Sequence, residues 1–357
     1  MKKSDAIDLY VDYLLANSGQ ATATELSALT DNSMKHDYIS DCLAQEGLDQ
    51  KVFWKQVKPF VREHESENGA IIIDDTIVDK LYSTINEVIN YHFDHTKGMS
   101  VKGINLLNFL YNIEVGGEFI NCPIAFHVIR KDQPYIDKNG NRKFRSSLTK
   151  NQLMRDILRR LVFVNQIKCK YILFDTWFSA NDNLKFIQKD LKRTFVCPLK
   201  KNRLIALSYE DKLAGKFISV ESLNMTANEL RTVYIKGLDF DVQLVRKVFT
   251  NKDRSEGELF LITNDTSMDY EQISKIYQGR WKIEEYHKSL KQNALLGKSP
   301  TKMETSQCNH IFTANLAYLQ LERLKIKERL NHFALKAKIR LKMLMAALDE
   351  VHALKMS

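Results

Sequence analysis

The stretch GAIIIDDTIVDK, residues 69–80, decides the fold. A run of β-branched apolar residues, from Ala70 to Ile73, stands directly before two adjacent aspartates, Asp74 and Asp75. Such a run is typical of a buried strand. Because successive side chains of a strand point to opposite faces, only one of the two aspartates can serve a site on a given face. We favour Asp74 and keep Asp75 as the alternative.

The same pattern returns about a hundred residues later in KYILFDTWF, residues 170–178, where an apolar run ends at Asp175. Right-handed crossovers predict that this strand lies parallel to, and beside, the strand that begins at Ala70. The carboxyl ends of such strands share one edge of the sheet, where ligands of open α/β sheets collect. The sequence therefore predicts that the two strand-end carboxylates lie at the same edge.

The segments around these strands predict a mixed sheet flanked by helices. Two β-rich halves around Gly116-Gly117, within residues 102–131, indicate a hairpin. Residues 147–166 and 180–192 have helical periodicity, and residues 193–200 read as a further strand. From residue 202 to 258 the chain is β-rich and broken by glycine and asparagine, which indicates an insertion.

Both ends of the chain read as helical. Together with the core and the insertion, this predicts five units: a helical region 1–66, a first part of the core 67–201, the β-rich insertion 202–258, a second part of the core 259–300 and a helical region 301–357. In the first unit we expect a short helix capped by Thr24, a break at residues 31–33, and a second helix. This layout suits a helix-turn-helix that contacts DNA, with two basic residues near the start of its second helix, Lys35 and His36. The second helix would turn three side chains inward, namely Tyr38, Ile39 and Leu43. The last unit is dense in basic residues and is either a solvated helix surface or a track for phosphates.

Composition narrows the class of protein. The chain has 357 residues and a formal net charge of +9, which raises the expectation of a polyanionic partner such as nucleic acid. Its five cysteines have no C-x-x-C spacing, so we expect neither a disulfide scaffold nor a zinc ribbon. This cysteine pattern fits the reducing environment of a cytoplasm. Nor is there a secretory signal or an apolar run long enough to span a membrane.

The stretch IYQGRWKIEEYHKSLK, residues 276–291, falls in what we expect to be one long helix from Asp269 to about Leu296. At about 100° per residue, four side chains fall on one stripe of it: Tyr277, Arg280, Glu284 and Lys291. A solvated face with i,i+4 ion pairs would look partly similar. Two neighbours of the stripe, Trp281 and Lys288, are further candidates for contact with DNA. Trp281 and Tyr286 are also expected to anchor the helix against the sheet.

Asp74, Asp175 and Glu284 can together provide a cage of hard oxygen ligands. Mg²⁺ prefers a few carboxylates, its own waters and phosphate oxygens of the substrate. Two such ions can activate an attacking oxygen and stabilise the leaving one in phosphoryl transfer. Basic groups beside the glutamate would hold the phosphate backbone, with Arg280 as a planar fork and Lys291 as a point charge. A second metal signal, His92-x-x-His95, lacks the partners that a tetrahedral zinc site needs.

The spacing Tyr277-x2-Arg280-x3-Glu284-x6-Lys291 resembles the Y-R-E-K signature of DDE transposases in the insertion-sequence-four superfamily. The stretches IIIDDT and YILFDTWFS look like the two aspartate strands of that family, in the same order. DHTKGMSVKGINLLNFLY, residues 94–111, is similar to the segment that follows the first motif in the branch near insertion sequence seven-hundred-one. The resemblance covers most of residues 20 to 320.

The resemblance implies an RNase H-like core with a β-rich insertion and an N-terminal helical domain that recognises transposon ends. It also implies Mg²⁺ or Mn²⁺ as the cofactor, with two ions bound by Asp74, Asp175 and Glu284. The partners would be double-stranded DNA, as terminal inverted repeats and as target, and a second copy in a synaptic homodimer. The reaction would be metal-dependent cleavage at transposon ends and strand transfer in a cut-and-paste pathway.

Relatives that form a DNA hairpin stack a flipped base on a tryptophan of the insertion, but residues 202–258 contain none. Three other aromatic residues of that region are candidates for this role: Tyr209, Phe217 and Tyr234. Trp177, two residues after Asp175, is expected either in the core or against DNA. Two alternatives to a transposase stay open, namely a DNA-binding regulator that has lost catalysis and an RNase H-like nuclease that cuts without joining.

Overall fold

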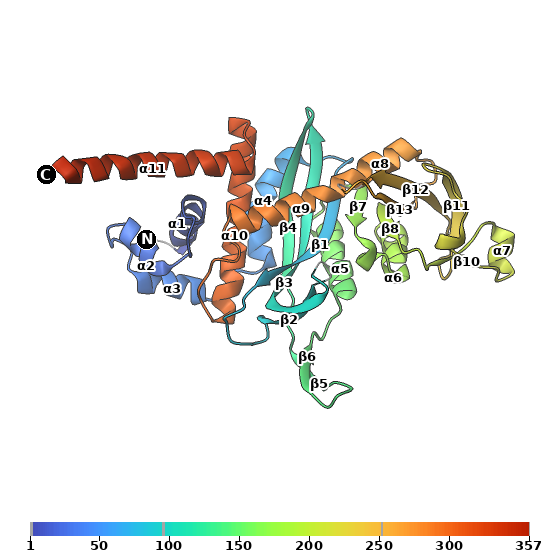
Figure 1. Cartoon of the computed structure of the whole chain (residues 1–357), viewed down its shortest axis with the longest axis horizontal. Coiled ribbons are helices and arrows are strands. Elements are labelled where there is room, and N and C mark those ends of the chain that lie inside the picture. Colours follow the sequence, from blue (N-terminus) through green and yellow to red (C-terminus); the bar gives the residue numbers. More distant parts are fainter. Residues whose placement is uncertain (1–2, 95–96, 251–252, 357) are drawn as a thin grey trace.

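A computed structural model of the chain describes residues 3–94, 97–250 and 253–356. In these residues one mixed sheet of eleven strands runs through the molecule, with helices on its faces and at both ends (Figure 1). The predicted α/β class, with a mixed-sheet core and helical regions at both ends of the chain, is confirmed. None of the helices in the described ranges combines the length and the apolar composition that crossing a membrane requires.

The centre of the sheet is strand β1, Ala70–Asp79, whose first four residues are buried. It pairs antiparallel with β3, Met99–Val115, which pairs in turn with β2, Asn90–Asp94, and with β4, Glu118–Val128. The turn between β3 and β4 is formed by Gly116 and Gly117, both at positive φ. Glycine adopts that conformation without steric cost, and the predicted hairpin is therefore confirmed.

On the other side of β1 lies β7, Tyr171–Phe174, and the two strands run parallel with Ile73 opposite Phe174. Strand β8, Thr194–Leu199, continues the parallel arrangement beside β7. The predicted neighbourhood of the two apolar runs is confirmed. Because Ile73 and Phe174 are paired, the residues that follow them, Asp74 and Asp175, stand at neighbouring positions on the sheet.

The β-rich region extends the same sheet beyond β8. In the described residues the order continues from β8 through β13, β12 and β11 to β9 and β10. The bounds are β9 Leu204–Ala206, β10 Ile218–Ser219, β11 Leu230–Ile235, β12 Val242–Thr250 and β13 Glu256–Thr263. The boundaries of the five predicted units stay predictions, and the one at residue 258 falls inside β13.

A two-stranded hairpin stands apart from the large sheet. Its strands are β5, Gln133–Ile136, and β6, Arg142–Arg145. The sequence analysis missed this hairpin because its strands are polar and only four residues long. Three helices follow or flank it in the chain: α5 Lys150–Arg159, α6 Asn181–Lys185 and α7 Tyr209–Leu213. Both α5 and α6 end in a five-residue π-helical segment.

The N-terminal helices are α1 Lys3–Ala16, α2 Ala23–Leu29, α3 His36–Ala44 and α4 Gln50–His64. The predicted break between α2 and α3 is present. The predicted cap is wrong, because Thr22 and not Thr24 accepts a hydrogen bond from the backbone of Glu25. Thr22-x-x-Glu25 has the spacing of a capping box, which explains the choice. Of the three side chains expected inside, Ile39 and Leu43 are buried and Tyr38 is exposed.

The expected single helix from Asp269 is interrupted. It consists of α8, Tyr270–Gln278, a 3₁₀ turn at Gly279–Trp281, and α9, Lys282–Gln292. The prediction of one continuous helix was therefore wrong, and the interruption begins at a glycine, a weak helix former. Further on lie α10, Glu304–Glu328, and α11, His332–Met356, which projects from the body in Figure 1.

Helix α10 joins the two ends of the chain. It contacts the N-terminal helices α1, α3 and α4, and it also contacts β4 and α9. Buried polar bonds secure the first contact: Tyr10 Oη lies 3.0 Å from His310 Nδ1, and Asn309 Nδ2 donates to Leu43 O at 2.8 Å. Lys336, at the base of α11, donates to carbonyl oxygens at the end of α1, including Leu15 O. One continuous apolar core therefore includes the N-terminal helices and the sheet.

Candidate active site

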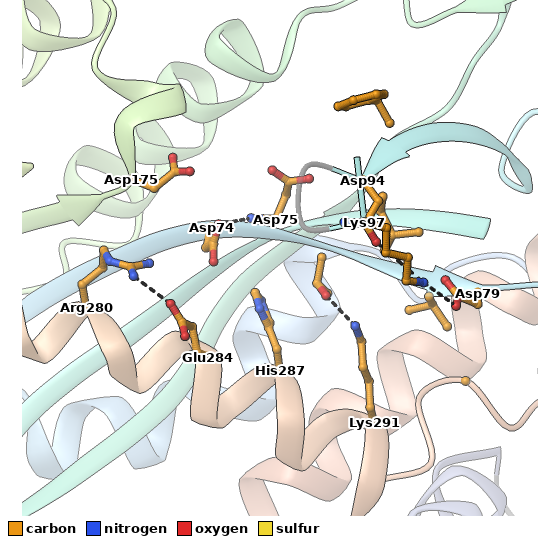
Figure 2. Close-up of a pocket in the computed structure, with 15 residues that line it drawn as sticks. Asp74, Asp75, Asp79, Asp94, Lys97, Asp175, Arg280, Glu284, His287 and Lys291 are labelled. Carbon is orange, nitrogen blue, oxygen red and sulfur yellow. Dashed lines mark hydrogen bonds and ion pairs between the residues drawn. The ribbon is translucent and has the colours of Figure 1, made fainter. Parts of the chain in front are cut away.

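A cavity of about 830 Å³ opens between β1, the end of β7 and helix α9. It is lined by all three predicted acids and by two of the predicted DNA-binding residues, Arg280 and Lys291 (Figure 2). The remaining lining residues are Asp75, Thr76, Ile77, Val78, Asp79, Phe93, Asp94, Lys97, His287 and Gly297. Acids that are far apart in the sequence, at positions 74, 175 and 284, are thus brought to one cavity.

Asp74 lies in the middle of β1, and not at its end as the sequence predicts, because the strand continues to Asp79; Asp175 does directly follow the last residue of β7. Burial, and then the neighbouring charges of Asp175 and Asp75, raise the pKa of Asp74 to about 7. Burial, together with Asp75, also raises the pKa of Asp175. Asp175 accepts a hydrogen bond from Trp177 N at 3.0 Å, which fixes its carboxylate at the start of a short 3₁₀ turn. A site that concentrates carboxylates in this way favours a cation.

Asp74 and Asp75 point to opposite sides of β1, as strand alternation predicts (Figure 2). Asp75 is already engaged, since its Oδ2 accepts from Lys150 Nζ at 2.6 Å and from Asn105 Nδ2 at 3.0 Å. Lys150 begins α5, so Asp75 serves the α5 side of the sheet. Asp74 lies on the side of α9, where Arg280 lowers its pKa against the larger effect of burial.

Glu284 is held by Arg280. The guanidinium donates to Glu284 Oε1 at 2.7 Å. The i,i+4 ion pair that a solvated helix face would carry is therefore formed. Arg280 is only 9% exposed, and its Nε is buried without a hydrogen-bond acceptor among the described residues. Its guanidinium lies between two rings, 5.7 Å from the centroid of Tyr277 and 5.1 Å from that of Trp281. The two aromatic residues therefore fix the direction of the arginine.

Three of the predicted DNA-binding residues do not line the cavity. Tyr277 is buried under Arg280, and burial raises its pKa to about 12. Trp281 is 54% exposed, so the expectation that it anchors the helix against the sheet was wrong. Trp281 belongs to the 3₁₀ turn and faces solvent there, whereas Tyr286 is fully buried, as expected. Lys288 points to α11, with its ammonium 5.0 Å from the ring centroid of Phe333.

Lys291 crosses from α9 to β1, where its Nζ donates to Thr76 Oγ1 at 2.8 Å. Thr76 is two residues beyond Asp74 and so faces the same side of the strand. Burial lowers the pKa of Lys291. The lysine is thus positioned at one end of the cavity while Arg280 is at the other, with Glu284 between them on the same helix (Figure 2).

His287 also lines the cavity, and the sequence analysis did not single it out. It is buried, and its Nε2 lies 3.1 Å from Asn108 Nδ2. An amide NH₂ only donates, so Nε2 accepts and the ring proton resides on Nδ1. Burial, helped by Lys291 and Arg280, lowers the pKa of His287 to about 3. The ring therefore stays neutral. Its i+3 spacing from Glu284 was the available signal.

An acidic rim at the far end of the cavity was also not foreseen. Lys97 Nζ lies 2.9 Å from Asp79 Oδ2 and 3.7 Å from Asp94 Oδ2. Asp79 closes β1 five residues beyond Asp74, and Asp94 closes β2, so both belong to strand ends at this edge. A sequence signal existed for Asp79 alone, because it lies within the stretch DDTIVD.

The donor set fits a divalent cation in its chemistry. Asp74, Asp175 and Glu284 are hard oxygen donors around one cavity, as Mg²⁺ or Mn²⁺ requires. Within the described ranges, however, no three His, Cys, Asp or Glu side chains are close enough together to hold one ion, since Glu284 is turned to Arg280. The His92-x-x-His95 spacing receives no support as a zinc site. His92 is buried on the sheet, and His95 lies outside the described residues.

The aromatic residues considered for base stacking lie at the other end of the sheet. Tyr209 and Tyr234 pack with ring centroids 5.8 Å apart, and Lys212 Nζ lies over both rings. Phe217 lies under Lys236 Nζ. Five strand-to-strand steps separate β11 from β1, which at about 4.8 Å each amounts to roughly 24 Å. Trp177 is nearer to the acids and is 47% exposed.

Two family models match the sequence, and together they contain all three acids. A model described as "DDE superfamily endonuclease" matches residues 2–212, and one described as "Transposase DDE domain" matches residues 146–320. A comparison with curated proteins gave no match. The first model covers more than half of the chain, and the mixed sheet with its helices is consistent with the RNase H-like core of that superfamily. The chain therefore belongs to the DDE superfamily of endonucleases, and it is an enzyme of the DDE nuclease and transposase type.

Proposed function

We propose that this protein is a DNA transposase that cleaves at the ends of a mobile element and transfers the strands into target DNA by cut-and-paste. The observation that carries the proposal is the cavity in which Asp74, Asp175 and Glu284 meet Arg280 and Lys291. Carboxylates for metal ions and cations for phosphates are the two components that phosphoryl transfer to and from DNA requires. Both occur here: Asp74 on β1, Asp175 directly after β7, and the other groups on the 3₁₀ turn and α9.

The metal ligands in this proposal are Asp74, Asp175 and Glu284, and Mg²⁺ is the expected ion. When bound, the ion supplies charge stabilisation at the scissile phosphate and activates the attacking oxygen. Asp74 is preferred over Asp75 because Lys150 and Asn105 already occupy the Asp75 carboxylate. Glu284 would exchange its bond to Arg280 for the ion, which at the same time frees the guanidinium for a phosphate oxygen.

The remaining polar groups hold the DNA strand. Arg280 offers a planar fork of donors, and its unpartnered buried Nε would find an acceptor in a phosphate oxygen. His287 presents Nδ1–H as a neutral donor, and Lys291 contributes a positive charge at the other end. Tyr277 and Trp281 act on the DNA through the direction of Arg280. This division of roles explains why the arginine is buried between two rings.

The test is cleavage of the element's own terminal repeats, with and without Mg²⁺, by the wild type and by Glu284→Gln. We expect Mg²⁺-dependent nicks at the element ends by the wild type, joined products with a target plasmid, and loss of both in the variant with binding retained. Binding without nicking by the wild type would indicate a regulator. Nicks without joined products would indicate a nuclease.

The cut-and-paste pathway and the synaptic dimer need their own measurements. Sequencing the cleaved element ends distinguishes DNA hairpins from open ends, and open ends alone would exclude the hairpin step. Light scattering of the protein with the terminal repeats should give two protein copies and two DNA ends in one complex. A complex of one copy with one end, unchanged at high concentration, would contradict the homodimer.

A further inference from the structure

The β5–β6 hairpin projects from the body as a separate ribbon (Figure 1). All eight residues of its two strands are exposed. Residues 131–145 contain five basic and two acidic side chains, a net charge of +3 in fifteen residues. The turn is ordered by Asp137, whose Oδ1 accepts from the amides of Asn139 and Asn141. The ribbon thus has a defined shape and carries a positive charge without belonging to the core.

Its cations are arranged in two ways. Lys143 is neutralised by Asp137 at 2.7 Å. Arg142 and Arg145, by contrast, have no carboxylate partner within the described part of the chain. The guanidinium of Arg142 lies 5.5 Å from the ring centroid of Phe144 in the same strand. The guanidinium of Arg145 lies 5.7 Å from the ring centroid of Tyr135 in the opposite strand. Aromatic support holds an arginine in direction and leaves its donors available.

Both feet of the ribbon are fixed next to the catalytic cavity. Before β5, Lys131 Nζ donates to Tyr91 O in β2 at 2.5 Å, and Asp132 accepts from Ser147 N at 2.9 Å. After β6, the chain reaches Lys150, whose ammonium binds Asp75 of the cavity lining. Arg145 precedes Lys150 by five positions, which span at most about 18 Å. DNA with a strand in the cavity, at a diameter of about 20 Å, therefore passes within reach of the ribbon.

We propose that the β5–β6 hairpin enters the major groove of the DNA beside the cleavage position. Arg142 and Arg145 face opposite sides of the ribbon, so one is directed to guanine edges and the other to phosphates. The inference rests on the proposed function and adds to it the part of the DNA that this segment contacts. A two-stranded ribbon fits the major groove, and arginine is the residue that grips guanine O6 and N7 with two bonds. The excess of positive charge favours DNA over a second protein copy, whose own ribbon carries the same sign.

The test compares three double variants of the full chain on 40-base-pair duplexes from the element's own termini. Arg142→Glu/Arg145→Glu reverses the charge of the ribbon, and Arg142→Lys/Arg145→Lys keeps the charge without the planar fork. The matched control, Lys168→Glu/Lys192→Glu, makes the same charge change at exposed positions before β7 and β8, at the opposite end of these strands from Asp175. All four side chains are exposed, and thermal melting confirms that each variant folds.

We expect the ribbon reversal to weaken binding on the order of 10- to 100-fold and to lower the salt slope by about 2, while the control stays near wild type. Guanine N7 beside the cleavage position should be protected from dimethyl sulfate by the wild type, less by the lysine variant and not by the glutamate variant. Equal binding and equal protection by all proteins would overturn the proposal, as would a loss of dimer with unchanged DNA affinity. The proposed function fails separately, if the wild type does not nick with Mg²⁺.

Discussion

At Asp74, burial and the neighbouring charges of Asp175 and Asp75 act on the carboxyl group in the same direction. Its pKa is raised to about 7, from an ordinary value of 3.8, so the folded protein binds a proton that the unfolded chain releases between these values. Stability of the metal-free protein therefore falls as the pH rises from about 4 to 7. Above pH 7 the full penalty for an ionised Asp74 remains.

Asp74→Asn should remove this penalty. We expect the metal-free variant to be more stable than the wild type at pH 8, by roughly 1–3 kcal/mol, and equal to it near pH 4. Denaturant unfolding at the two pH values measures the difference. Asp75→Asn is the matched control with the opposite expectation, since it leaves Lys150 without its carboxylate and lowers stability at pH 8. Equal effects of both variants would contradict the assigned difference between the two aspartates.

His287 gives the opposite dependence on pH. Its pKa is lowered to about 3, below the ordinary 6.5, so the folded state binds fewer protons than the unfolded chain in this range. The stability that this neutral ring contributes is lost as the pH falls from 6.5 to 3. In His287→Gln, the decrease of the unfolding free energy on acidification should be smaller by on the order of 2 kcal/mol. Unfolding free energies from pH 4 to 7 test it, and a decrease as steep as that of the wild type would contradict the assignment.

At the scale of elements, the two aspartate strands could be predicted from the sequence because their signal is local. An apolar β-branched run, its length and the residue that ends it are all visible at positions 70–75 and 171–175. Their parallel pairing followed from the handedness of crossovers. That Asp74 and Asp175 are neighbours was therefore predictable without coordinates, whereas the continuation of β1 beyond Asp74 to Asp79 was not.

The helix that carries Glu284 was less predictable, because its shape depends on what packs against it. A periodicity of 3.6 residues cannot reveal the 3₁₀ turn at Gly279–Trp281. This turn, and not the helical stripe, buries Arg280 and exposes Trp281. The bond from His287 to Asn108 likewise joins residues 179 positions apart, a pairing that a single sequence does not contain. Long-range polar pairs of this kind are why the lining of the cavity was only partly foreseen.

The start of α2 provides a test of local rules. Thr22 caps the helix through Glu25 N at 3.1 Å, whereas Thr24 lies inside the first turn. Thr22→Ala should cost about 1 kcal/mol of stability, and Thr24→Ala, the matched control, should cost much less. Thermal unfolding of the two variants gives the comparison. A larger loss for Thr24→Ala would restore the cap that the sequence analysis expected.

At the scale of the whole molecule, the N-terminal helices depend on α10. Tyr10 and Leu43 bond directly to residues of α10, and the apolar core runs through both. A fragment of residues 1–66, the predicted helical unit, should therefore be largely unfolded alone, although it contains four helices. Circular dichroism of the fragment measures this, with the full chain as the reference. A cooperative thermal transition of the fragment would contradict the dependence on α10.

The contact between α10 and the first helices also sets an order in time. The ribosome releases α1 to α4 first, yet the surface that completes their packing, residues 304–328, is synthesised nearly at the end. The packing of the early helices must therefore wait until translation has passed that segment. A polypeptide that ends before residue 304 would lack the helix against which α1, α3 and α4 pack.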